Sequence, residues 1–270
     1  MKKHMKKYKK GIIHSVLSAV VLFVLIARFL RGDYYAVFLC ALTLILFYIP
    51  VVAERTFNVT LPKVLEVIIL FFVFAAEILG EIGNFYTYIP WWDTMLHTVN
   101  GFLMAAIGFA MIDILNNSPR FHFSLSPIFV AFVSVCFSMT VGVVWEFFEF
   151  GMDTFTGNDM QKDRIVTSVS SVELNPDGVN DPVKLTNIEK TVVYYSYGKE
   201  YVIEGGYLDV GVADTMKDMI VNAIGAVVFS VIGYFYILGR NKGIFASKFI
   251  PLLKSARKKE QSDKTDDSSD

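Results

Sequence analysis

Long, almost uninterrupted runs of apolar residues constrain this chain more than any other feature of its sequence. Six such runs cover about residues 11–31, 34–53, 64–82, 94–115, 124–150 and 215–239. Each is long enough to cross a hydrocarbon core of about 30 Å, which takes a helix of about 20 residues. A hydrophobic content of 54% and a mean hydropathy of +0.47 are also too high for a soluble globular protein. The sequence therefore predicts an all-α polytopic membrane bundle of six transmembrane helices with a small β-rich extracytoplasmic loop.

The runs divide the chain into five parts. We expect a basic cytoplasmic N-terminus at 1–10, transmembrane helices one to five within 11–153, an extracytoplasmic loop at 154–213, helix six at 214–240 and a cytoplasmic tail, basic then acidic, at 241–270. Lys and Arg crowd before the first run and after the last, and such residues stay on the cytoplasmic side. This predicts a multi-pass cell-membrane protein with both termini in the cytoplasm and the lipid bilayer as its partner. The basic N-terminus is then an orientation signal, and no nucleic-acid partner is expected.

The loop at 154–213 carries the sequence signals of β-structure. Asn175-Pro176-Asp177-Gly178 is a strong turn signal. The stretches 191–197 and 200–204 are rich in Val, Ile and Tyr and predict a β-hairpin. About 60 residues suffice for a small cap but are marginal for an independent domain.

Polar residues within the apolar runs gather at one end of the predicted bundle. With alternating topology, the outer ends of spans three to six carry Glu77 and Glu81; Asp93, His97 and Asn100; Glu146, Glu149 and Asp153; and Asp214, Asp218 and Asn222. Within each helix the spacing keeps the set on one face. Ionisable groups in a span cost about 2.5–3.5 kcal/mol each on insertion scales and usually mark function.

Each of these residues also has a simpler interpretation. Asp93 and Asp214 fit helix N-caps, where the helix dipole favours a carboxylate. Asn100 and Asn222 fit interhelical hydrogen bonds, and Gly101 fits a close approach of two helices.

The negative charge of this cluster needs a neutralising partner. Lys217 is the only Lys or Arg within these helix ends, and we expect it to point away from Asp214 and Asp218, which would exclude ion pairing. Protonation of the carboxylates is one alternative. A divalent metal is the other, because imidazole with carboxylates and no thiolate suits Zn, Mn, Fe or Mg.

These considerations give three functional hypotheses. The first is a divalent-metal-dependent hydrolase of a lipid or envelope substrate, with metal ligands Asp93, His97, Glu149, Asp153 and Asp214 and catalytic residues Glu146 and Asp218. The second is a proton- or cation-coupled membrane transporter that uses the same carboxylates. The third is a non-catalytic envelope partner protein with a structural cluster.

Four sequence strings resemble one family of bacterial membrane proteins. They are Trp92-Asp93-Thr94-Met95-Leu96-His97 with Gly101; Trp145-Glu146-Phe147-Phe148-Glu149 through Asp153; Asn158-Asp159-Met160-Gln161; and Asp214-Thr215-Met216-Lys217-Asp218-Met219 with Asn222 and Gly225-Ala226. Together they are similar to the YjdF-like multi-pass proteins, a family with no assigned activity, over about residues 83–235. The insert at about 162–207 is longer than is usual for such proteins. The resemblance implies a bacterial cell-membrane protein and supports these residues as candidates, but implies no reaction.

Overall fold

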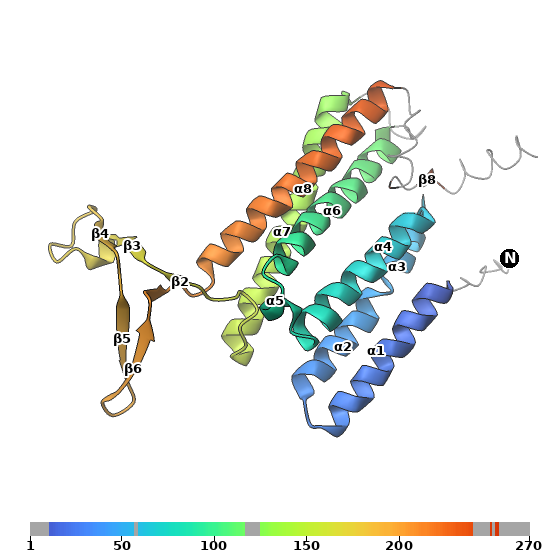
Figure 1. Cartoon of the computed structure of the whole chain (residues 1–270). Coiled ribbons are helices and arrows are strands. Elements are labelled where there is room, and N and C mark those ends of the chain that lie inside the picture. The colour runs from blue at the N-terminus through green and yellow to red at the C-terminus, as the bar shows by residue number, and fades with distance from the viewer. Residues whose placement is uncertain (1–10, 57–58, 117–124, 240–248, 250–251, 254–270) are drawn as a thin grey trace, which may run out of the picture. The chain divides into compact units, whose positions relative to one another are not determined.

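The computed structural model describes residues 11–56, 59–116, 125–239, 249 and 252–253. The chain divides into two compact units, one formed by residues 1–142 and 221–270 and the other by residues 143–220. Their helices and strands are shown in Figure 1. The predicted N-terminal segment 1–10 and most of the predicted tail 241–270 lie outside the described residues.

Helices follow all six of the predicted apolar runs. They are α1 (Ile12–Leu30), α2 (Tyr34–Leu46), α3 (Ile49–Thr56), α4 (Lys63–Phe74), the π-helix η1 (Ala75–Ile82), the short α5 (Phe85–Tyr88), α6 (Trp92–Asn116), α7 (Pro127–Thr156) and α8 (Val212–Leu238). Five stretches of the described residues are long and apolar enough to cross a membrane: Ile12–Leu30, Tyr34–Thr56, Trp92–Asn116, Pro127–Thr156 and Val212–Leu238. The third predicted span, 64–82, is formed by α4 and η1 and contains Glu66, Glu77 and Glu81. Five candidate spans are therefore found, and the sixth stays a prediction.

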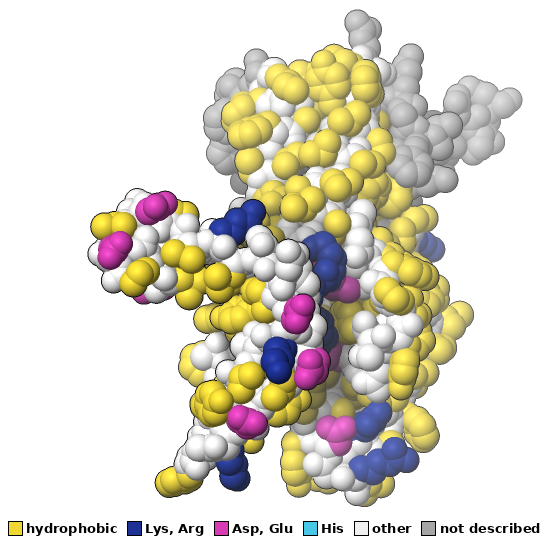
Figure 2. Space-filling view, turned by 60° about the vertical axis from the view of Figure 1, so that its left-hand side comes forward, with side chains coloured by type: hydrophobic (Ala, Val, Ile, Leu, Met, Phe, Trp, Pro, Cys, Tyr) yellow, Lys and Arg dark blue, Asp and Glu magenta, His cyan; other side chains and the backbone are white. Residues whose placement is uncertain are grey.

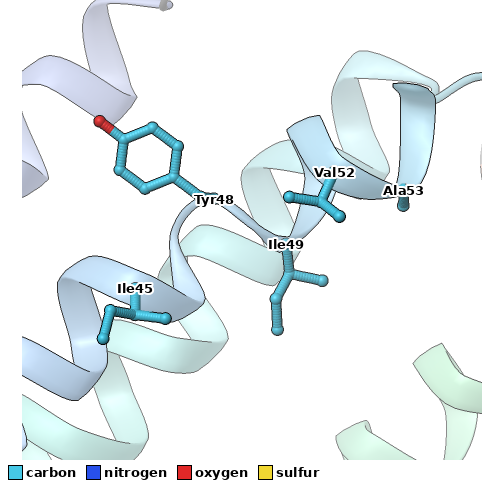
Figure 3. A pocket seen from close by; sticks show the side chains of 5 residues that line it. All are labelled: Ile45, Tyr48, Ile49, Val52 and Ala53. Atoms are coloured by element: carbon cyan, nitrogen blue, oxygen red, sulfur yellow. The ribbon is translucent and has the colours of Figure 1, made fainter. Parts of the chain in front are cut away.

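The second of these spans is interrupted at Phe47 and Tyr48, shortly before Pro50. Proline has no backbone N–H to bond the carbonyl four residues earlier, which here is that of Leu46, the last residue of α2. Side chains on both sides of the break line an open cavity of about 360 Å³: Ile45, Tyr48, Ile49, Val52 and Ala53 (Figure 3). This lining is almost wholly apolar, so the cavity is not the place for an ion.

The core of the first unit consists of two hydrophobic clusters. One joins α4, α6 and α8 with the first half of α7 and contains Leu65, Phe109 and Phe229. The other joins α1, α2, α4 and η1 and contains Val21 and Cys40. The second cysteine of the chain is exposed on α7.

Large apolar side chains also cover the outside of the helices. Phe23 is 74% exposed, Ile128 66% and Phe132 62%. Figure 2 shows hydrophobic side chains over much of the visible surface of the helices. Extensive apolar surface of this kind marks contact with lipid or with another protein.

The second unit contains three short antiparallel strand pairs. Strand β2 (Ile165–Val166) pairs with β7 (Tyr207–Leu208), β3 (Ser168–Ser171) with β4 (Val183–Thr186), and β5 (Lys190–Tyr195) with β6 (Lys199–Glu204). The β5–β6 pair is the predicted hairpin. The predicted turn is also present, since the Asn175 side chain accepts a hydrogen bond from the Asp177 N–H and the Asn175 carbonyl accepts one from the Gly178 N–H. In the first unit, β1 (Val59–Thr60) pairs with β8 (Leu252–Leu253).

Candidate functional site

Helices α6 and α8 of the first unit cross with their backbones in contact. A Cβ built on Gly225 would lie 2.0 Å from the carbonyl oxygen of Thr98, and one on Gly101 would lie 2.0 Å from that of Asn222. Only glycine fits at either position. The prediction that Gly101 lets two helices approach closely is therefore confirmed.

A layer of neutral polar side chains lies at this crossing. The Nδ2 of Asn100 donates a hydrogen bond of 3.0 Å to the Oδ1 of Asn222, which is fully buried. The hydroxyl of Ser138 on α7 donates a bond of 2.9 Å to the carbonyl of Gly101. These bonds tie α6 to both neighbouring helices, so the interhelical role predicted for Asn100 and Asn222 is confirmed. The sequence interpretation missed Ser138, although Ser134, Ser138 and the following Gly142 form a stripe of small residues at four-residue spacing.

The Asp93–His97 pair lies one helical turn before this layer on α6. The Nε2 of His97 is 3.4 Å from the Oδ1 of Asp93, and both side chains are largely buried. Asp93 occupies the first turn of α6, where unpaired N–H groups of the helix favour a carboxylate. Imidazole beside carboxylate is a chemically suitable start for a metal site.

In the second unit, the acidic face of α7 is held in place by hydrogen bonds. The indole N–H of Trp145 donates a bond of 2.8 Å to the Oε1 of Glu149, and Glu146 is buried. The carboxylate of Asp153 accepts bonds from the backbone N–H groups of Met160 and Gln161, at 2.6 and 2.9 Å. Asp153 thus shapes the loop that leaves α7, and both of its oxygens are used in doing so. Its predicted role as a metal ligand stays untested.

Asp214, at the start of α8, forms two ion pairs. Its Oδ1 lies 2.8 Å from the Nη2 of Arg164 and 3.2 Å from the Nζ of Lys217. Lys217 also lies 3.3 Å from Asp218. The expectation that ion pairing could not neutralise these two carboxylates is therefore wrong. Residues three apart on a helix are only roughly 60° apart around its axis, and the long lysine side chain covers that distance. Arg164 was missed because it lies 50 residues away in the chain.

Further carboxylates line the loop after α7. Burial raises the pKa of Asp163 above its ordinary value, and the negative charges of Asp159, Asp209 and Asp153 raise it further. Asp159 accepts a hydrogen bond from the N–H of Asp163 at 3.2 Å, and Asp209 accepts one from the N–H of Arg164 at 2.8 Å. These carboxylates, too, bond to backbone groups of the loop, so they have a structural role.

Apolar helices of spanning length, tied together by a buried polar layer, define an integral membrane protein. The chain belongs to the family described as predicted membrane protein (DUF2238), whose model matches residues 13–239. This match supports the resemblance to a membrane-protein family, extends it beyond 83–235, and leaves the YjdF name itself unconfirmed. Comparisons with curated proteins and with solved structures found no match for the chain.

Proposed function

We propose that this membrane protein binds a divalent metal ion through Asp93, His97 and Asp218. The observation that carries the proposal is the Asp93–His97 pair, whose Nε2 and Oδ1 lie 3.4 Å apart one turn before the α6–α8 crossing.

The continuity of α8 supports Asp218 as the third ligand. Asn222 of α8 hydrogen-bonds to Asn100 of α6 within the first unit. Asp218 precedes Asn222 by four residues on the same unbroken helix, and His97 precedes Asn100 by three. At about 1.5 Å rise per residue, each residue lies about one turn before the residue of its own helix that makes this contact.

The proposed ligand set suits catalysis better than a purely structural site. One imidazole and two carboxylates leave a coordination position open, as in catalytic zinc sites, and also suit Mn, Fe or Mg. A cation there lowers the pKa of bound water and polarises a carbonyl or phosphoryl oxygen. We therefore propose a metal-dependent hydrolase of a lipid or envelope substrate. Glu146, buried on α7, is the proposed general base, and Glu149 is oriented by Trp145.

Orientation is part of the proposal, with both termini in the cytoplasm and the site facing outward. Arg55 and Lys63 between spans two and three agree with the positive-inside rule. Cysteines introduced into the 175–190 segment should react with a membrane-impermeant thiol reagent in intact cells. Cysteines introduced after Lys259 should not, and the opposite labelling would refute the outward-facing site.

Elemental analysis of the detergent-purified protein tests the metal site. We expect wild-type protein to retain a divalent metal, and His97→Ala and Asp218→Asn to weaken its binding by about tenfold or more. Asp153→Asn is the matched control, because that carboxylate bonds to two backbone N–H groups. Equal metal content in all four proteins would contradict the proposed ligands.

Activity distinguishes the hydrolase from the two other hypotheses. Purified protein in vesicles should hydrolyse ester or phosphoester lipids, and a chelator should abolish the turnover. Metal-free protein that carries protons or cations across liposomes would favour the transporter instead. Metal-free protein without either activity would favour a structural envelope partner.

A further inference from the structure

Glu77 of the π-helix η1 is a carboxyl group buried inside the first unit. Glu77 is only 2% exposed, and its Oε2 has no hydrogen-bond partner among the described residues. An unpaired carboxylate in such a place costs several kcal/mol, whereas a neutral carboxylic acid costs far less. Short π-helical segments inside α-helices are rare and frequently occur at functional sites.

The segment that carries Glu77 takes part in an apolar cluster. The apolar cluster of α1, α2, α4 and η1 includes its chain neighbour Ile78 together with Cys40. The negative charge of Glu81, one turn further along η1, acts on Glu77. The charges of Glu77, Arg28 and Asp33 act on Cys40. The Arg28 guanidinium binds Asp33 at 3.2 Å and the carbonyl of Ile82 at 3.3 Å.

Other elements packed against η1 bring further titratable groups. They include Tyr34 and Tyr35 on α2, Glu66 on α4, Tyr86 and Tyr88 on α5, and Asp93 and His97 on α6. The ring of Tyr86 lies against η1 at Gly80, where it occupies the place of a side chain. No basic side chain among the described residues forms an ion pair with Glu77 in the structure.

We propose that Glu77 is a proton-binding site inside the first unit, on the π-helix η1, and exchanges its proton with the surface through Glu81. Glu81 is half-buried and lies next to Ile82, where η1 ends, so it is the step between the buried acid and the helix end. A metal ion at Glu77 would require several oxygen ligands, and among the described residues Glu77 belongs to no group of ligand-type side chains that could hold one. This site is separate from the proposed metal ligands and does not depend on them.

Labelling with dicyclohexylcarbodiimide tests the proposal, since this reagent adds to protonated carboxyl groups in apolar surroundings. Mass spectrometry of the labelled wild-type protein should find the adduct on Glu77. The labelling should fall about tenfold per pH unit above its midpoint, as the protonated fraction does. Glu77→Gln should abolish the adduct. Glu81→Gln should move the midpoint to lower pH, because it removes a neighbouring negative charge. Glu66→Gln, on the first turn of α4, is the control and should leave the profile unchanged.

Infrared spectroscopy provides a second measurement that does not depend on reagent access. The spectrum should contain a protonated-carboxyl band that is absent from Glu77→Gln and that titrates with the same midpoint as the labelling. Absence of this band, or labelling of Glu77 that stays constant between about pH 5 and about pH 9, would overturn the proposal. A midpoint unchanged in Glu81→Gln would overturn the exchange route.

Discussion

Replacing Gly225 by alanine should push α6 and α8 apart. The new Cβ would lie 2.0 Å from the Thr98 carbonyl oxygen and 3.0 Å from the Phe102 nitrogen, whereas ordinary contacts begin at 3.4 Å. Both of these atoms belong to backbone and cannot rotate away. The helices must therefore separate by roughly 1.4 Å, the difference between the shortest contact and an ordinary one.

The cost of this separation has two parts. Overpacking a well-packed site costs about 1–3 kcal/mol. Separation of this size also breaks the Asn100–Asn222 hydrogen bond, now 3.0 Å long, and such bonds between membrane helices are worth about 0.6 kcal/mol on average. We expect Gly225→Ala to lower the free energy of unfolding by about 2–4 kcal/mol.

Gly151→Ala is the matched control for this experiment. Gly151 also lies in a long helix, α7, but a Cβ there meets no atom within 4 Å. Alanine should therefore stabilise the helix by about 0.5–1 kcal/mol. Unfolding of both variants in mixed micelles of mild detergent and dodecyl sulfate, followed by circular dichroism, measures the difference. Equal stability of the two variants would refute the close backbone contact. If the metal proposal also holds, Gly225→Ala should bind less metal, since ligand distances tolerate only about 0.2 Å.

Three further changes test the second unit and the α7–α8 packing. Arg164→Ala should cost about 1–2 kcal/mol in stability, because it removes one of two cations from the buried Asp214 carboxylate. Asp163→Asn should stabilise the protein at neutral pH. Because the pKa of Asp163 is raised, the folded state binds the Asp163 proton more tightly than the unfolded state does. The stability of the wild-type protein therefore falls as the pH rises through the pKa of this group in the unfolded state, about 3.9. Ser134→Ala should cost about 1 kcal/mol because it orphans the buried Ser230 hydroxyl, now 2.6 Å away. The double Ser134→Ala/Ser230→Ala variant should recover part of that loss.

Thermal or denaturant unfolding measures all three effects. An Arg164→Ala protein as stable as a Lys162→Ala control would contradict the Asp214 ion pair. For Asp163→Asn, the gain should disappear below about pH 3, and a gain that is independent of pH would contradict the sign of the pKa shift. Strictly additive Ser134 and Ser230 losses would show that the two hydroxyls are not coupled.

The sequence by itself determined the helices, the hairpin and the faces of the helices on which the polar residues lie. Periodicity and apolar length are local properties, so the runs at 11–31 and 94–115 were sufficient to predict α1 and α6. The i, i+4 spacing of Asp93 and His97 likewise placed them side by side, as observed. Gly101 predicted a close helix contact because no larger residue permits one.

Only the tertiary structure decided which partners the carboxylates have. Asp214 pairs with Arg164 because the β-rich loop returns to the start of α8, and Asp153 bonds to backbone groups seven and eight residues later. Spacing along one helix carries no information on either contact. The burial of Glu77 likewise depends on elements packed against η1, among them α2, α4 and α6. The sequence alone does not show whether the partner of a carboxylate is a cation, a backbone N–H or a proton. Long-range packing sets the electrostatic surroundings of the carboxylate.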